Sequence, residues 1–103
     1  MPQTNAPLSS SEVTSEIRRA VDILCRIAGV RRIWFFGSHA AYKGRPGSDL
    51  DFAVEGLPSE ALFSTLGELM LGLRAPVDLV RWEDAGNALR GEILRQGTVV
   101  YAT

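Results

Sequence analysis

Residues 33–54 of this 103-residue chain read IWFFGSHAAYKGRPGSDLDFAV, and this stretch decides the fold. An apolar, aromatic run leads into Gly37-Ser38, and ten residues later Asp49-Leu50-Asp51 begins a second apolar run. Short aromatic and β-branched runs on either side of a polar loop are typical of two buried strands. A tight turn that can hold phosphate therefore lies ten residues before two carboxylates that can hold a divalent metal.

Patterns of helix and strand alternate along the rest of the chain. Ser9 and Glu12 have the spacing of a capping box, and the apolar positions behind them recur every three or four residues toward Gly29. Pro58 suits the first turn of a second helix. We expect helices from Ser9 to Gly29, over residues 59–73 and over residues 85–95, with strands at residues 31–36, 49–55, 77–81 and 98–101. The alternation predicts an α/β fold with helices packed on one small sheet.

Length and composition are those of one globular domain. Hydrophobic residues make up 46% of the chain and charged residues 22%, which allows a modest core. Residues 1–8 are polar and contain two prolines, so we expect a disordered lead-in before a single domain over residues 9–103. The net charge of −1 gives no reason to expect binding to nucleic acid or to a membrane surface. Neither a signal peptide nor an apolar span of about 20 residues is visible, so we expect a cytoplasmic protein.

The apolar residues divide into core and surface candidates. Cys25 is the only cysteine, which excludes an intramolecular disulfide, and we expect it to be a small buried residue. On the second helix Met70 is expected in the core, whereas Phe63 and Leu71 fall off the main apolar face and can mark an interface. The aromatic residues expected in the core are Trp34, Phe35, Phe36 and Phe52.

A third carboxylate completes a possible metal site. Asp78 lies in a later apolar run, PVDLV at residues 76–80. Residues two apart in a strand project from one face, so Asp49 and Asp51 share a face opposite Leu50. Two such charges about 6 Å apart repel by roughly 2.8 kcal/mol at an effective dielectric constant of about 20. Three converging carboxylates therefore favour a bound cation, and oxygen ligands beside an anionic nucleotide favour Mg²⁺ or Mn²⁺ over zinc.

Two ions held in this way would clamp a phosphoryl-transfer reaction. One ion activates the attacking hydroxyl, and the other neutralises the triphosphate and the leaving pyrophosphate. Gly37 lets the backbone approach a phosphate, and Ser38 adds a hydroxyl donor. Each motif alone usually has a simpler structural explanation. A Gly-Ser pair is usually a turn, and an Asp-x-Asp sequence is usually a loop or a solvated strand edge. Asp78 alone can be a solvent-facing residue on a half-buried strand. Their order along the chain favours the site, and the lack of a GxxxxGKS or GxxxxGKT sequence excludes a P-loop.

The spaced Gly-Ser and Asp-x-Asp, followed by an acidic residue on a later strand, resemble the minimal nucleotidyltransferases of the DNA polymerase β-like superfamily. The resemblance covers roughly residues 11–101 and includes the closing ILRQGTVVY at residues 93–101. It implies a nucleotidyltransferase fold, in which helices pack on one mixed sheet, and two Mg²⁺ or Mn²⁺ ions. By the same resemblance Asp49 and Asp51 bind both ions, and Asp78 binds the catalytic ion and helps to activate the nucleophile. The residues expected to bind the nucleotide are Gly37, Ser38 and Ser48.

Minimal members of this superfamily are commonly encoded beside a HEPN-domain RNase toxin. The resemblance implies an antitoxin that transfers AMP from ATP to a tyrosine of such a toxin. The chain departs from many members at residues 39–42, which read His-Ala-Ala-Tyr where those members carry Arg-Ala-Arg-Gly. This departure leaves open an antitoxin that neutralises its toxin by binding alone. A third possibility is a nucleotidyltransferase that acts on a small molecule such as an antibiotic, which the short chain disfavours.

Overall fold

A computed structural model describes residues 9–37 and 50–103, so the lead-in predicted at residues 1–8 lies outside the described residues. The two η elements are short 3-10 helices. Along the chain the elements are α1 (Ser10–Leu24), β1 (Arg32–Phe36), β2 (Leu50–Glu55), η1 (Ser59–Ala61), α2 (Leu62–Gly72), β3 (Val77–Arg81), η2 (Trp82–Asp84), α3 (Asn87–Gln96) and β4 (Thr98–Ala102).

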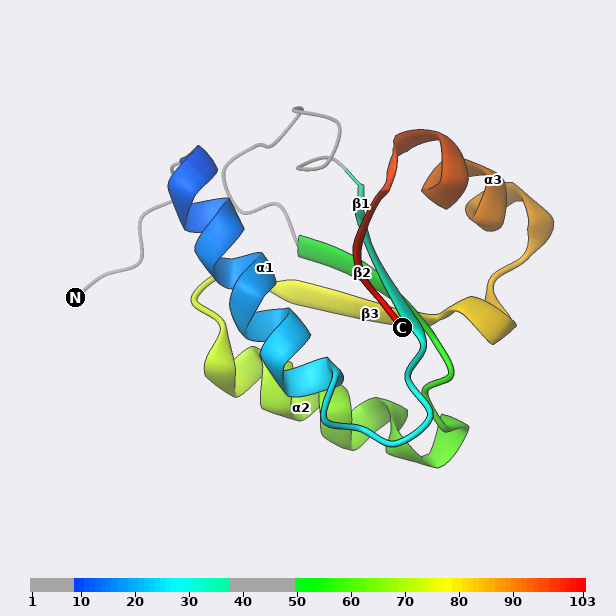
Figure 1. The fold of residues 1–103 in the computed structure, drawn as a ribbon, viewed down its shortest axis with the longest axis horizontal. Helices are drawn as coiled ribbons and strands as arrows, with labels where there is room; N and C mark the ends of the chain where they lie inside the picture. Colours follow the sequence, from blue (N-terminus) through cyan, green and yellow to red (C-terminus); the bar gives the residue numbers. More distant parts are fainter. Residues whose placement is uncertain (1–8, 38–49) are drawn as a thin grey trace.

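The four strands form one mixed sheet in the order β3-β2-β1-β4. β1 is antiparallel to both β2 and β4, whereas β2 and β3 are parallel. A parallel pair needs a crossover connection, and α2 supplies it. Figure 1 shows α1 and α2 together on one side of the sheet, with α3 on the other side. The predicted α/β fold with helices packed on a mixed sheet is confirmed.

Strand alternation divides the core into two layers. Ile33 and Phe35 of β1 face α1 and α2, whereas Trp34 and Phe36 face α3. The larger layer also contains the buried leucines and valines of β2, β3 and α2. The smaller layer contains Ile93 of α3. All four aromatic residues predicted for the core are buried, so the sheet buries side chains on both faces.

The first helix begins as predicted and ends earlier. Ser9 accepts the N–H of Glu12 through its hydroxyl and donates its own N–H to the Glu12 carboxylate, which completes the predicted capping box. The helix ends at Leu24, and two tight turns carry the chain past Gly29, whose φ is +99°. The apolar pattern overran the helix because the turns also place apolar residues on the core. Cys25 is the C-cap and is exposed, so its predicted burial is wrong: Leu24 takes the last core position of the helix.

The second helix carries apolar side chains on its outer surface as well as its inner one. Leu69 is fully buried, whereas Met70 is 62% exposed, so the predicted burial of Met70 is wrong. Consecutive helical residues point about 100° apart, and Leu69 already faces the sheet. Phe63 and Leu71 are 83% and 92% exposed, which confirms that they lie off the core face. Within the described residues, no helix is both long and apolar enough to cross a membrane.

Two turns meet at the end of the sheet where β2 finishes. Gly56 has a φ of +93°, and a Cβ atom there would overlap the carbonyl group of Gly29. Glu83 accepts the backbone N–H of Gly56 at 2.9 Å, and Arg31 lies 3.9 Å from the Glu83 carboxylate and 3.6 Å from that of Glu55. A close backbone contact and a carboxylate therefore hold this end of the sheet together.

Candidate functional site

Three strands bring Phe36, Asp51 and Asp78 into one row across the sheet. Phe36 of β1 pairs with Asp51 of β2, and Asp51 pairs with Asp78 of the parallel strand β3. Paired residues project from the same face, and neighbouring strands lie about 4.8 Å apart. Leu50 and Phe52, on either side of Asp51, are buried on the opposite face. Two of the three predicted carboxylates therefore lie side by side on the α3 side of the sheet.

The two carboxylates differ in exposure. Asp51 is half-buried, whereas Asp78 is exposed and accepts the N–H of Leu79 through Oδ1 at 3.0 Å. Unit charges about 5 Å apart repel by about 3 kcal/mol at an effective dielectric constant of about 20. A cation between them would remove this repulsion. Asp78 is exposed to solvent, as the simpler interpretation of the sequence predicts. It also lies beside Asp51, as the metal-site interpretation requires.

Gly37 lies directly against the Asp51 carboxylate. Its φ is +87°, and a Cβ atom at this position would overlap Oδ2 of Asp51. A side chain at position 37 would thus strain the backbone and push the carboxylate out of its place. The sequence explains the glycine at position 37 by the close approach of a phosphate to the backbone. The structure adds a second reason for glycine, because the absent side chain makes room for a carboxylate of the site.

The remaining predicted site residues, Ser38, Ser48 and Asp49, lie outside the described residues. Within residues 9–37 and 50–103, no group of three or more histidine, cysteine, aspartate or glutamate side chains could hold a metal ion. The two carboxylates that are brought together offer only oxygen donors, which suits Mg²⁺ better than a soft metal. The paired aspartates therefore fit a divalent cation, and Asp49 as its third ligand stays a prediction.

An aromatic stack lies one row behind the carboxylates. Trp34 pairs with Ala53 on the same sheet face, two residues along each strand from Phe36 and Asp51. Trp34 stacks on Trp82 with ring centroids 4.5 Å apart, and the Arg90 guanidinium lies 4.7 Å from the Trp82 ring centroid. Arg90 also donates to the backbone carbonyl of Trp82 at 2.9 Å. Trp82 therefore packs on Trp34 and helps to join η2 to the sheet.

Glu16 is a buried carboxylate that the sequence interpretation did not single out. Its side chain is 2% exposed, and it contacts the turn between α2 and β3 through the backbone N–H groups of Arg74 and Ala75. The signal in the sequence was its place on the apolar stripe of α1, four residues before the buried Ala20. An acidic residue at a core position indicates a specific partner.

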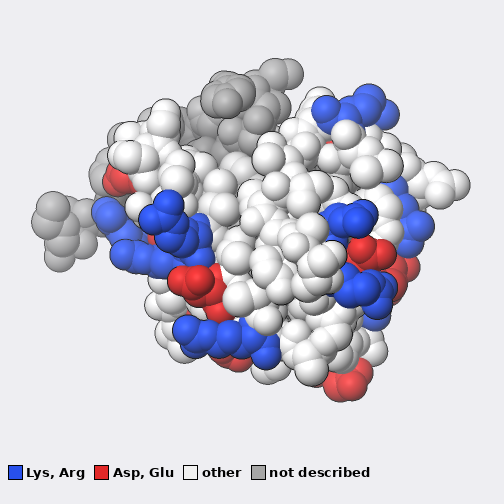
Figure 2. All heavy atoms as spheres, in the orientation of Figure 1, with Lys and Arg blue, Asp and Glu red and all other residues white. Residues whose placement is uncertain are grey.

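Charges of both signs are mixed on the face of the molecule shown in Figure 2. Basic and acidic groups lie together in two areas that a broad uncharged stretch separates. Opposite charges also pair in the described part of the molecule, as Arg74 does with Glu12 at 3.8 Å. Nucleic-acid recognition usually needs a continuous basic surface, and the described residues form none on this face.

Residues 13–103 match the protein family described as Polymerase beta, Nucleotidyltransferase. This match covers nearly the whole chain, including every described residue of the carboxylate row. No curated protein is similar enough to count as a match.

Solved structures show the same fold. A chain in the crystal structure of a toxin-antitoxin with AMP-PNP is 25% identical, with 93% of this chain and 75% of that chain covered and a TM-score of 0.69. A chain in a structure of the tri-AMPylated Shewanella oneidensis HEPN toxin in complex with MNT antitoxin is 24% identical, with 87% and 72% covered and a TM-score of 0.71. A chain in the crystal structure of the toxin-antitoxin MntA-HepT is 24% identical, with 87% of this chain and 73% of that chain covered and a TM-score of 0.71.

Proposed function

Because the chain belongs to the polymerase β nucleotidyltransferase family, we propose that it transfers AMP from ATP to a tyrosine of a HEPN toxin and so acts as the antitoxin of that toxin. The relatives of known structure support the partner and the group transferred. One of them is a complex that contains AMP-PNP, and another contains a tri-AMPylated HEPN toxin with its MNT antitoxin. We also propose that the two proteins meet in the cytoplasm, where ATP is available.

The register that places Asp51 beside Asp78 is the observation that carries this proposal. In the transfer, the tyrosine hydroxyl oxygen bonds to the α-phosphorus of ATP while the bond from that phosphorus to the bridging oxygen breaks. Pyrophosphate leaves with the bonding electrons, and the hydroxyl gives up its proton. Two Mg²⁺ or Mn²⁺ ions bound at the carboxylates would supply positive charge to the attacking and leaving oxygens.

The protein residues divide the remaining tasks. Asp51 is half-buried against Gly37, so its carboxylate is held in a defined position to ligate metal. Asp78 is more exposed, so an incoming hydroxyl can reach it. The N–H of Leu79 occupies one acceptor position of Oδ1, so the Asp78 carboxylate keeps lone pairs both to ligate the metal and to take the tyrosine proton. We further propose that Asp49 completes the metal ligands and that Ser38 and Ser48, with the backbone at Gly37, hold the triphosphate.

Labelled ATP, Mg²⁺ and the HEPN protein encoded beside this chain would test the proposal. Asp51→Asn and Asp78→Asn keep the size of each side chain and remove its charge, so we expect at least a hundredfold loss of label transfer, by analogy with the loss of one catalytic electrostatic group (roughly 10²–10³-fold). Asp84→Asn is the matched control, because Asp84 is exposed on η2 and pairs with Arg81. Transfer that is unchanged in both site variants would refute the assignment.

A second candidate is an antitoxin that neutralises its toxin by binding alone. The His-Ala-Ala-Tyr sequence at residues 39–42 favours it, because many members of the superfamily carry two arginines there. The exposed Phe63 and Leu71 of α2 offer apolar area to a partner. Toxin neutralisation by an Asp51→Asn/Asp78→Asn double variant would support this candidate over the enzyme, and failure to neutralise by the correctly folded variant would reject it.

A further inference from the structure

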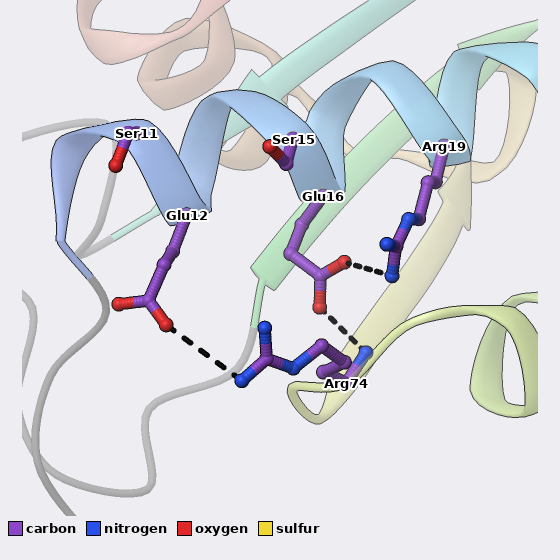
Figure 3. Close-up of a pocket in the computed structure, with 6 residues that line it drawn as sticks. All are labelled: Ser11, Glu12, Ser15, Glu16, Arg19 and Arg74. Atoms are coloured by element: carbon purple, nitrogen blue, oxygen red, sulfur yellow. Dashed lines mark hydrogen bonds and ion pairs between the residues drawn. The ribbon is translucent and has the colours of Figure 1, made fainter.

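The buried carboxylate of Glu16 lies where α1 meets the turn between α2 and β3. Oε1 accepts the backbone N–H of Arg74 and, at 3.1 Å, that of Ala75. Oε2 lies 3.5 Å from the Arg19 guanidinium, and the described residues give this buried atom no hydrogen bond. Figure 3 shows Glu16 reaching from α1 toward the turn, with Arg19 and Glu12 on the same helix. A charged side chain thus crosses from one element to the backbone of another.

The turn that Glu16 holds leads directly into the two strands of the carboxylate row. Ala75 is followed by Pro76, whose carbonyl accepts the N–H of Leu50 at 2.8 Å. Leu50 begins β2 next to Asp51, and Val77 begins β3 next to Asp78. One short path therefore connects the Glu16 carboxylate with the first hydrogen bond between the strands that carry the site.

Glu16 supplies the acceptor for two backbone N–H groups of this turn. The carboxyl-terminal end of α2 finishes at Gly72, and the N–H groups at residues 74 and 75 lie beyond the helix, before the β2–β3 pairing begins. Backbone N–H groups next to a buried side chain need an acceptor. A carboxylate with two such bonds holds them more strongly than a neutral acceptor would.

We propose that Glu16 is a positioning residue for the metal site. Its carboxylate fixes the start of β3 and, through Pro76, the start of β2, and so keeps Asp51 and Asp78 opposite each other. Glu16 touches neither metal nor nucleotide in this role. The functional part of this inference rests on the proposed nucleotidyl transfer, whereas the effect of Glu16 on the strand ends does not depend on it.

Amide hydrogen exchange of the 103-residue chain tests the structural step without any activity. Removing a hydrogen-bonded charged group typically changes an equilibrium by about tenfold or more, so in Glu16→Ala we expect the Leu50 amide to exchange at least tenfold faster. The amide of Ile33 in the β1 strand pairs elsewhere and should change less than threefold if the effect is local. Glu16→Gln keeps an amide oxygen as acceptor and should restore most of the protection. Equal acceleration at Leu50 and Ile33 would mean a general loss of stability and would overturn the proposal.

Binding of Mn²⁺ with AMP-PNP, followed by electron paramagnetic resonance, tests the effect on the site. Misplacing catalytic groups by about 1 Å can reduce rates by roughly a hundredfold, so we expect Glu16→Ala to bind Mn²⁺ about tenfold more weakly and to lose kcat while the KM for the acceptor protein changes less than twofold. Wild-type chain that binds Mn²⁺ but transfers no AMP would reject the proposed function and leave this test intact. Unchanged Mn²⁺ affinity in Glu16→Ala would reject the positioning role.

Two controls separate position from general destabilisation. Arg74→Ala keeps the backbone N–H that Glu16 binds, so it should leave Leu50 exchange and Mn²⁺ affinity near wild type. Glu83→Ala removes a carboxylate that also holds a turn, at the opposite end of the sheet, through the N–H of Gly56. We expect faster exchange at Gly56 and unchanged Mn²⁺ binding in Glu83→Ala. Weakened Mn²⁺ binding in either control, equal to that of Glu16→Ala, would contradict the proposal.

Discussion

Replacement of Gly37 by alanine should damage the site through a single methyl group. The φ of Gly37 is +87°, and the added Cβ would overlap the Asp51 carboxylate. A left-handed conformation costs a residue other than glycine about 1–2 kcal/mol. The overlap can be relieved only if the backbone or the Asp51 side chain moves. We therefore expect Gly37→Ala to lose both stability and activity.

The size of each loss follows from these contacts. For a domain of roughly this size, 1 kcal/mol shifts the midpoint of thermal unfolding by about 4–8 °C, so a strain of 1–2 kcal/mol predicts a decrease of about 4–16 °C. Displacement of a metal-binding carboxylate by about 1 Å predicts a loss of label transfer of roughly a hundredfold. Circular dichroism measures the first quantity, and transfer of labelled AMP at a temperature where the variant is folded measures the second.

Gly67→Ala is the matched control for this experiment. Gly67 lies within α2, and a Cβ there would meet no atom within 4 Å. Alanine in a helix is favoured over glycine by roughly 0.5–1 kcal/mol, so this variant should be slightly more stable and fully active. Wild-type transfer by folded Gly37→Ala would refute the argument that glycine is needed to seat Asp51.

Three further predictions concern other parts of the molecule. Gly56→Ala should lower the free energy of unfolding by at least about 2 kcal/mol, because φ is +93° and the Cβ would overlap the Gly29 carbonyl. Urea unfolding measures this loss, and AMP transfer per folded molecule should stay unchanged. The pKa of Glu12 is lowered from its usual 4.5, first by the backbone N–H of Ser9, then by the Ser9 side chain and the charge of Arg74. The ionised capping box therefore stabilises the fold above pH 4.5, and this stabilisation is lost as the pH falls below that value. Glu12→Gln should therefore be less stable than wild type at pH 7, with a gap in thermal midpoint that narrows toward pH 3; a gap independent of pH would contradict the assignment. Chelation with EDTA should abolish AMP transfer and added Mg²⁺ or Mn²⁺ should restore it, whereas transfer that persists in EDTA would exclude a metal at the aspartates.

Local patterns predicted most of the secondary structure because they report local interactions. The capping box at Ser9 and Glu12 marked the start of α1, and β3 runs from Val77 to Arg81 as expected. Alternation along β2 also placed Asp51 opposite its buried neighbours. Prediction failed at Cys25 and Met70, where the end of one helix and the orientation of another depend on what the helix packs against.

The sequence by itself determined the order of helices and strands, the face of Asp51 on its own strand, and the family to which the chain belongs. Only the tertiary structure decided that these two aspartates lie opposite each other, because that register depends on contacts between strands joined by a long crossover. The same is true of Gly37 against Asp51 and of Glu16 at the α2–β3 turn. Each of these contacts joins residues that are distant in the sequence, and no local periodicity encodes such a pairing.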